Sequence, residues 1–168
     1  MRQADPATVA ALAARLAASG ERLLGRSLAI RHVDAGSCGG CEIELRAARG
    51  AAHGLAQYGL RFVESPREAD ILLVTGVVTR NMAQALRMTM AAMPRPRFVV
   101  AVGDCAMDGG VFKGGPAILG GADKVLPVDL LIGGCPPMPE EIIEGLLALV
   151  EANAPPPEKP APRTEPHA

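Results

Sequence analysis

Aromatic residues are nearly absent from this sequence, which has three Phe, one Tyr and no Trp among 168 residues. Hydrophobic residues still make up 49% of the chain, so a core of Ala, Val, Leu and Ile can support one domain. Such a core, together with 19 glycines, allows backbone segments to come close to one another or to a compact ligand.

An excess of basic charge and a long apolar run are also missing. The net charge is −1, without the basic face that nucleic-acid binding requires, so no nucleic-acid partner is expected. No segment reaches the roughly 18 consecutive apolar residues of a membrane span. The Ala-rich N-terminal stretch is interrupted by Arg15 and does not resemble a secretory signal. We therefore expect an intracellular protein, in which four cysteines are better metal ligands than disulfide partners.

Short apolar runs alternate with segments of helical periodicity along most of the chain. This alternation predicts an α/β fold, with a doubly wound parallel sheet of about five strands and helices on both faces. The third run is apolar almost throughout, as a strand buried on both faces should be. Strands are predicted at 28–33, 61–64, 69–78, 98–102 and within 124–132, and helices at 6–24, 41–58, 81–93 and 139–151.

Three parts of the chain are predicted from these patterns. Residues 1–27 form an N-terminal helical segment, which we expect to pack on the core as a surface helix, with a partner-docking helix as the alternative. Ser19-Gly20 is a predicted break in this helix. Residues 28–152 form the main domain. Residues 153–168 contain six prolines and are predicted to be extended or disordered.

The four cysteines all lie in glycine-rich loops, and the loops follow strand candidates. Cys38 and Cys41 follow the first strand, Cys105 the fourth and Cys135 the fifth. In an open parallel sheet, ligands bind beyond the carboxyl ends of the strands, where the strand order switches. The sequence therefore predicts that the four thiols converge on one edge of the sheet.

Four thiolates can hold either an iron–sulfur cluster or a zinc ion. Structural zinc sites usually pair two Cys-x2–4-Cys units, whereas this chain has one C-x-x-C pair and two separate cysteines. This spacing favours a cluster, but ligand type alone leaves a zinc-stabilised binding module without a redox role as an alternative. A thioredoxin-like C-x-x-C site would leave Cys105 and Cys135 unexplained.

Several segments, in this order, resemble the small subunit of energy-converting, membrane-associated [NiFe] hydrogenases, which is similar to the 20 kDa cluster-bearing subunit of respiratory complex I. The resemblance extends from about residue 30 to residue 147. Its segments are His32–Glu44, Leu73–Met82, Val102–Ala106, Val128–Asp129 and Gly134–Pro139.

The resemblance implies a flavodoxin-like fold and one [4Fe–4S] cluster, the one nearest the catalytic site of a large partner subunit. Cys38, Cys41, Cys105 and Cys135 match the ligand positions of the family one by one. The chain would then be a subunit of an oxidoreductase without a catalytic residue of its own. The C-x-x-C spacing sides with the hydrogenases, because complex I has two adjacent cysteines there; a complex I-like subunit that passes electrons to quinone is the alternative.

The resemblance also implies the partners and the location. These are a [NiFe]-type or complex I-type large subunit, a ferredoxin-like iron–sulfur subunit and, indirectly, membrane subunits. We expect the chain to be cytoplasmic and peripheral on the cytoplasmic face of the inner membrane. One departure is Gly133-Gly134 before Cys135, where the family often has Pro-Gly; this predicts a looser turn that keeps the ligand.

Acidic residues close to the cysteines have two interpretations. Glu42, Glu44 and Asp104 can be carboxylates that favour a helix N-terminus, or groups that tune the potential of a cluster or carry protons. His32 is expected to be a core or interface residue rather than a ligand.

Overall fold

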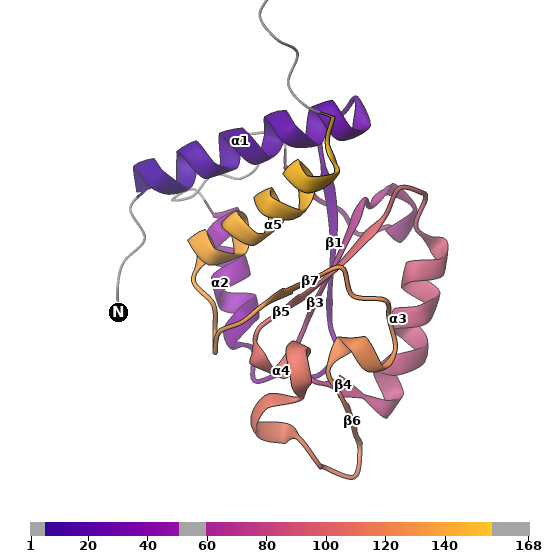
Figure 1. Cartoon of the computed structure of the whole chain (residues 1–168). Helices are drawn as coiled ribbons and strands as arrows, with labels where there is room; N and C mark the ends of the chain where they lie inside the picture. Colours follow the sequence, from indigo (N-terminus) through magenta and orange to yellow (C-terminus); the bar gives the residue numbers. More distant parts are fainter. Residues whose placement is uncertain (1–5, 51–59, 156–168) are drawn as a thin grey trace, which may run out of the picture.

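The computed structural model describes residues 6–50 and 60–155, and Figure 1 shows a central sheet between two layers of helices. The five strands of the main sheet are β1 (Ala29–Asp34), β2 (Arg61–Phe62), β3 (Ile71–Thr75), β5 (Phe98–Val102) and β7 (Leu130–Ile132), and a smaller sheet contains β4 (Val78–Thr79) and β6 (Ile118–Gly120). The helices are α1 (Pro6–Leu24), α2 (Gly40–Arg49), α3 (Arg80–Ala92), α4 (Asp104–Asp108) and α5 (Pro139–Asn153), with 3₁₀ turns η2 (Pro66–Glu68), η3 (Gly110–Phe112) and η4 (Ala122–Lys124).

The main sheet is parallel and its strand order is β2-β1-β3-β5-β7. The chain therefore moves outward from β1 to β2 and then reverses direction through β3, β5 and β7. This is the flavodoxin-like order, and its switch point lies between β1 and β3. The predicted doubly wound α/β fold is confirmed.

Each face of the sheet has its own apolar core. On β3, Ile71 and Leu73 belong to the core under α1, α2 and α5, whereas Leu72 and Val74 belong to the core under α3, α4 and η4. The alternation follows from the period of two in a strand. Every residue of β3 is buried, as predicted for a strand that is covered on both faces.

Helix α1 is continuous through Ser19-Gly20, so the predicted break is wrong. A Cβ at Gly20 would lie 3.2 Å from the Cβ of Leu28, which indicates that this glycine allows the helix to approach the chain entering β1. Val9 and Leu16 are fully buried in the core that α1 shares with α5. Helix α1 packs against α5, as Figure 1 shows. The expectation of a surface helix that packs on the core is confirmed.

Two short elements near the cysteines were not predicted. The run 69–78 contains two strands, because Gly76 turns the chain with φ +75° after β3 and β4 then pairs with β6. Helix α4 occupies what the sequence suggested was a loop. The predicted helix 41–58 ends at Arg49 as α2; residues 51–59 and the tail beyond residue 155 lie outside the described residues.

Candidate metal centre

The structure places all four cysteines at the carboxyl edge of the main sheet. Cys38 lies in the loop after β1, Cys41 in the first turn of α2, Cys105 in the first turn of α4 and Cys135 in the loop between β7 and α5. Because the strands are parallel, their carboxyl ends meet at this edge. Loops that follow neighbouring strands therefore bring together thiols that are far apart in the sequence.

The thiol of Cys41 is half-buried and lies within electrostatic reach of the other three cysteines. Burial raises the pKa of Cys41 to about 12, and the carboxylate of Glu42 and the neighbouring thiols act in the same direction. A thiol must lose its proton to become a ligand, so a cation is needed to hold this group as a thiolate.

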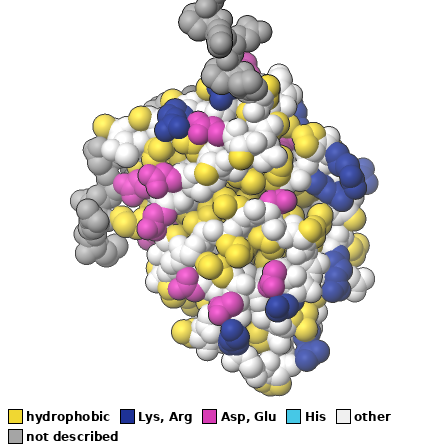
Figure 2. Space-filling model, viewed as in Figure 1, with side chains coloured by type: hydrophobic (Ala, Val, Ile, Leu, Met, Phe, Trp, Pro, Cys, Tyr) yellow, Lys and Arg dark blue, Asp and Glu magenta, His cyan; other side chains and the backbone are white. Residues whose placement is uncertain are grey.

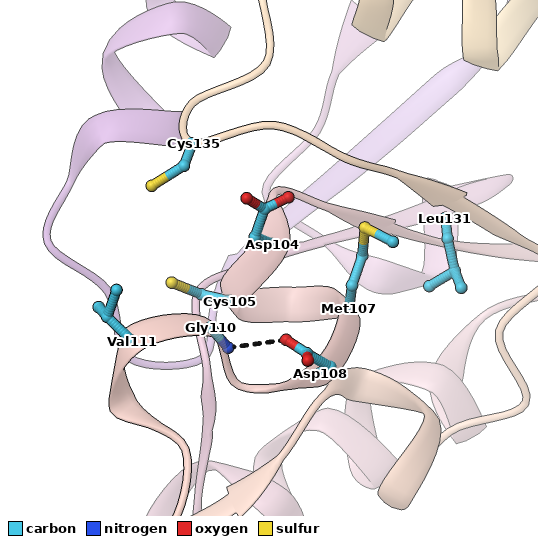
Figure 3. Close-up of a pocket in the computed structure, with 8 residues that line it drawn as sticks. All are labelled: Asp104, Cys105, Met107, Asp108, Gly110, Val111, Leu131 and Cys135. Atoms are coloured by element: carbon cyan, nitrogen blue, oxygen red, sulfur yellow. Dashed lines mark hydrogen bonds between the residues drawn. The ribbon is translucent and has the colours of Figure 1, made fainter.

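Cys105 is the most buried of the four cysteine residues, with 8% of its surface exposed, whereas Cys38 and Cys135 are exposed. Burial raises the pKa of Cys105, and the Coulombic effects of Cys135 and Cys38 act in the same direction. In Figure 3, the sulfurs of Cys105 and Cys135 point into the same hollow. The site therefore reaches from the protein interior to its surface.

Gly103 brings the backbone directly against a thiol. It adopts φ 91° and ψ 155°, a conformation that is essentially restricted to glycine. A Cβ at this position would lie 2.5 Å from the Sγ of Cys41, closer than any real Cβ contact. The turn from β5 into α4 thus depends on glycine for both its conformation and the space beside Cys41.

Asp104 joins the loops that carry Cys105 and Cys135. Its backbone N–H donates to the carbonyl of Gly134 at 2.9 Å, and the N–H of Gly134 donates to its Oδ1 at 2.7 Å. Each of these two residues directly precedes a cysteine. The turn at Gly133-Gly134 is therefore held by this reciprocal pair.

Glu42 accepts hydrogen bonds from two hydroxyl groups, those of Ser37 and Thr75. Burial by itself would raise the pKa of Glu42, but hydrogen bonds from Thr75, from the backbone and from Ser37 outweigh it, and the pKa is lowered. The sequence suggested Glu42 but not its partners. A polar Thr75 at the end of an otherwise apolar run was the available signal.

Glu44 was a candidate for a carboxylate near the site, and His32 was expected to be a core or interface residue. Glu44 lies in α2, two residues beyond Glu42, and His32 lies on β1 with its Nε2 2.8 Å from Oγ1 of Thr75. Burial is the main cause that lowers the pKa of His32. His32 therefore contacts the hydroxyl network around Glu42.

A hollow of about 690 Å³ adjoins Cys105 and Cys135 (Figure 3). Val111 and Leu131 on its rim are 85% and 48% exposed. On the face drawn in Figure 2, apolar side chains gather in the middle and charged groups lie mainly around them. The residues that line the hollow are Asp104, Cys105, Met107, Asp108, Gly110, Val111, Leu131 and Cys135.

A doubly wound α/β protein with four thiols at the carboxyl edge of its sheet is the class that the fold and the site define. Residues 38–149, which include all four cysteines, match the family model described as NADH ubiquinone oxidoreductase, 20 Kd subunit. The chain belongs to this family, which confirms the resemblance found in the sequence.

Relatives of the chain are subunits of oxidoreductase complexes, as predicted. The probable membrane-bound hydrogenase subunit mbhJ of Pyrococcus furiosus is 40% identical over 79% of this chain and 80% of its own length. A subunit of the NADH-quinone oxidoreductase of Clostridium beijerinckii is 46% identical over 66% of either chain, so the chain spans slightly less than two thirds of that relative.

A solved structure has the same fold. A chain of the membrane-bound sulfane sulfur reductase, an archaeal respiratory membrane complex, aligns with a TM-score of 0.67 and 30% identity, over 82% of this chain and 76% of its own. Within residues 6–50 and 60–155, no helix combines the length and the apolar character that a membrane span requires.

Proposed function

We propose that the chain is an electron-transfer subunit that holds one [4Fe–4S] cluster on Cys38, Cys41, Cys105 and Cys135. The observation that carries this proposal is the gathering of all four thiols from three strand-end loops at one edge of the sheet. A cluster held there would accept and release single electrons. The protein would supply the ligands, the surrounding hydrogen-bond donors and the docking surface.

The surroundings of the thiols are compatible with a bulky inorganic group. Glycines lie next to the sulfurs: a Cβ at Gly110 would be 3.0 Å from Sγ of Cys105, and one at Gly40 would be 3.6 Å from Sγ of Cys38. Glycine leaves the backbone N–H groups accessible as donors to sulfide, which is one of the means by which proteins tune a cluster.

The zinc alternative requires a tighter arrangement. A zinc ion binds each thiolate at about 2.3 Å, so all its ligands must reach one point. Among the residues that the structure describes, no group of three Cys, His, Asp or Glu is arranged to hold one metal ion. The same finding applies to a cluster, so the choice between the two rests on the sequence: one C-x-x-C pair with two separate cysteines is not the paired Cys-x2–4-Cys pattern of structural zinc sites.

For the partner, we propose the large subunit of a membrane-associated [NiFe] hydrogenase, with the cluster next to its catalytic site. The C-x-x-C spacing and the hydrogenase relative support this assignment. A ferredoxin-like subunit would exchange electrons with the chain, which would be peripheral on the cytoplasmic face of the membrane. A complex I-type large subunit and electron transfer to quinone form the second candidate, supported by the NADH-quinone oxidoreductase relative.

The neighbouring genes distinguish these two assemblies. A large subunit that carries two C-x-x-C nickel motifs would support the hydrogenase. A large subunit without these motifs would support the complex I-type assembly.

The cluster is tested by anaerobic purification of the full chain, followed by iron and acid-labile sulfide analysis and EPR of the dithionite-reduced protein. We expect about four irons and four sulfides per chain. Cys105→Ser should abolish the EPR signal, while Met88→Ala, on the exposed side of α3, should leave it unchanged. Stoichiometric zinc without sulfide would overturn the proposal, and an unchanged signal in C105S would show that the ligand set is wrong.

A further inference from the structure

Two polar residues bracket the loop from Cys38 to Cys41. Ser37 directly precedes this loop and Glu42 directly follows it, and the Ser37 hydroxyl donates to Oε2 of Glu42 at 3.0 Å. Oγ of Ser37 also accepts the backbone N–H of Gly39 at 3.0 Å. The side chains of Ser37 and Glu42 therefore join the two ends of the loop, and the backbone of Gly39 inside the loop is bound to Ser37.

The second carboxylate oxygen attaches the loop to the sheet. Thr75, at the end of β3, is fully buried and donates its hydroxyl to Oε1 of Glu42. An ionised carboxylate only accepts, so the single hydroxyl proton of Thr75 points to Glu42. The contact of 2.8 Å between His32 and Thr75 must then be donated by the ring, which assigns the Nε2–H tautomer to neutral His32.

Backbone contacts support the same junction between β1 and β3. The N–H of Val77 donates to the carbonyl of Gly36 at 2.9 Å. A Cβ at Gly76 would lie 2.7 Å from the Cβ of Ser37. The loops that follow β1 and β3 therefore touch here. Because Glu42 is hydrogen-bonded to Ser37 after β1 and to Thr75 at the end of β3, its carboxylate lies at the switch point of the sheet.

The charge of Glu42 is held close to the thiols. Its side chain is 15% exposed, so water screens it only partly. Reduction of a cluster adds a negative charge, and a fixed carboxylate next to a ligand opposes that addition.

We propose that Glu42 is a positioning residue for the cluster: it closes the ligand loop through Ser37, ties the loop to β3 through Thr75, and lowers the reduction potential by its charge. This inference rests on the proposed cluster site. If the wild-type chain binds no iron and sulfide, the proposed function fails; the outcomes below concern Glu42 in a chain that carries the cluster.

The charge is tested with Glu42→Gln, which keeps the size of the side chain and one acceptor oxygen. The matched control is Glu21→Gln, on an exposed part of α1. We expect wild-type iron and sulfide content in both variants, and a midpoint potential, followed by EPR during redox titration, that is more positive in E42Q alone. An E42Q protein that carries the cluster at the wild-type potential would overturn the role of the charge.

The attachment to β3 is tested with Thr75→Val, which keeps the shape and removes the hydroxyl, and with Thr75→Ser, which keeps the hydroxyl. We expect T75V to release iron to a chelator several-fold faster than wild type, and T75S to retain the wild-type rate. A wild-type rate in T75V would overturn the attachment.

The direction of the hydrogen bonds from His32 to Thr75 and from Thr75 to Glu42 can be measured without the cluster. In the cluster-free protein, the ¹⁵N shifts of the His32 ring should be those of the Nε2–H tautomer. An Nδ1–H tautomer would contradict the assigned direction of these bonds.

Discussion

Gly103 is the residue at which the fold and the site depend most directly on one another. It connects β5 to α4, and its Cα faces the thiol of Cys41. Its conformation costs roughly 1–3 kcal/mol for a residue with a side chain. A substitution there would strain the backbone and also displace a thiol, so its two effects have to be separated.

Gly103→Ala should lower the free energy of unfolding and also abolish iron loading, because the added methyl group would displace Sγ of Cys41. Gly114→Ala is the matched control: Gly114 also has a positive φ, +83°, but a Cβ there would meet nothing within 4 Å. We expect G114A to lose about 1 kcal/mol of stability and to keep its iron. Thermal unfolding and iron analysis of both variants measure this, and equal iron content in the two would contradict the prediction.

At the scale of elements, the short helix α4 and the loop after β7 are joined by Asp104 and Gly134. The N–H of Gly103 also donates to the carbonyl of Ile132 at 2.7 Å, so the β5–β7 pairing continues into the site. These contacts extend the sheet beyond the ends of its strands. They fix the distance between the loops that carry Cys105 and Cys135.

Asp104→Ala should loosen these loops, because the N–H of Gly134 loses its side-chain acceptor. Asp104→Asn keeps an acceptor oxygen and is the matched control. The lost bond is worth about 1 kcal/mol, or about five-fold in an equilibrium. We expect D104A to release iron to a chelator about five-fold faster than wild type, and D104N at a rate close to wild type. Equal release rates in D104A and D104N would remove the basis for this role.

At the scale of the whole molecule, the site opens to the surface where Val111 and Leu131 are exposed. Two of the four cysteines are exposed at the same edge. Exposed apolar side chains beside the thiols are suited to a partner subunit, because association would bury them. With the proposed cluster in place, association would also shorten the path for electrons. This surface is where we expect the large subunit to bind.

Val111→Asp should therefore weaken association with the large subunit about ten-fold or more while iron loading stays at the wild-type level, since burial of an unpaired charge is costly. Met88→Asp is the control, because Met88 is 63% exposed on α3, away from the thiols. Co-purification with a tagged large subunit measures this. If V111D binds like M88D, the partner covers another surface.

The elements that the sequence predicted well are those with a long local pattern. The strands at β1, β3 and β5 and the helices α1, α3 and α5 follow from apolar periodicity and were found within a few residues. Helix α4 and strands β4 and β6 were missed because they span only two to five residues, too few for a period to show. Their formation depends on contacts with the rest of the fold.

By itself, the sequence determined the family, the α/β fold and the placement of each cysteine after a strand, because periodicity and motifs are written in neighbouring residues. The tertiary structure alone decided which side chains support the thiols. Glu42 meets Thr75 across 33 positions, and Asp104 meets Gly134 across 30. Such pairs arise from the strand order that brings β1 beside β3 and β5 beside β7, and no local pattern records that order.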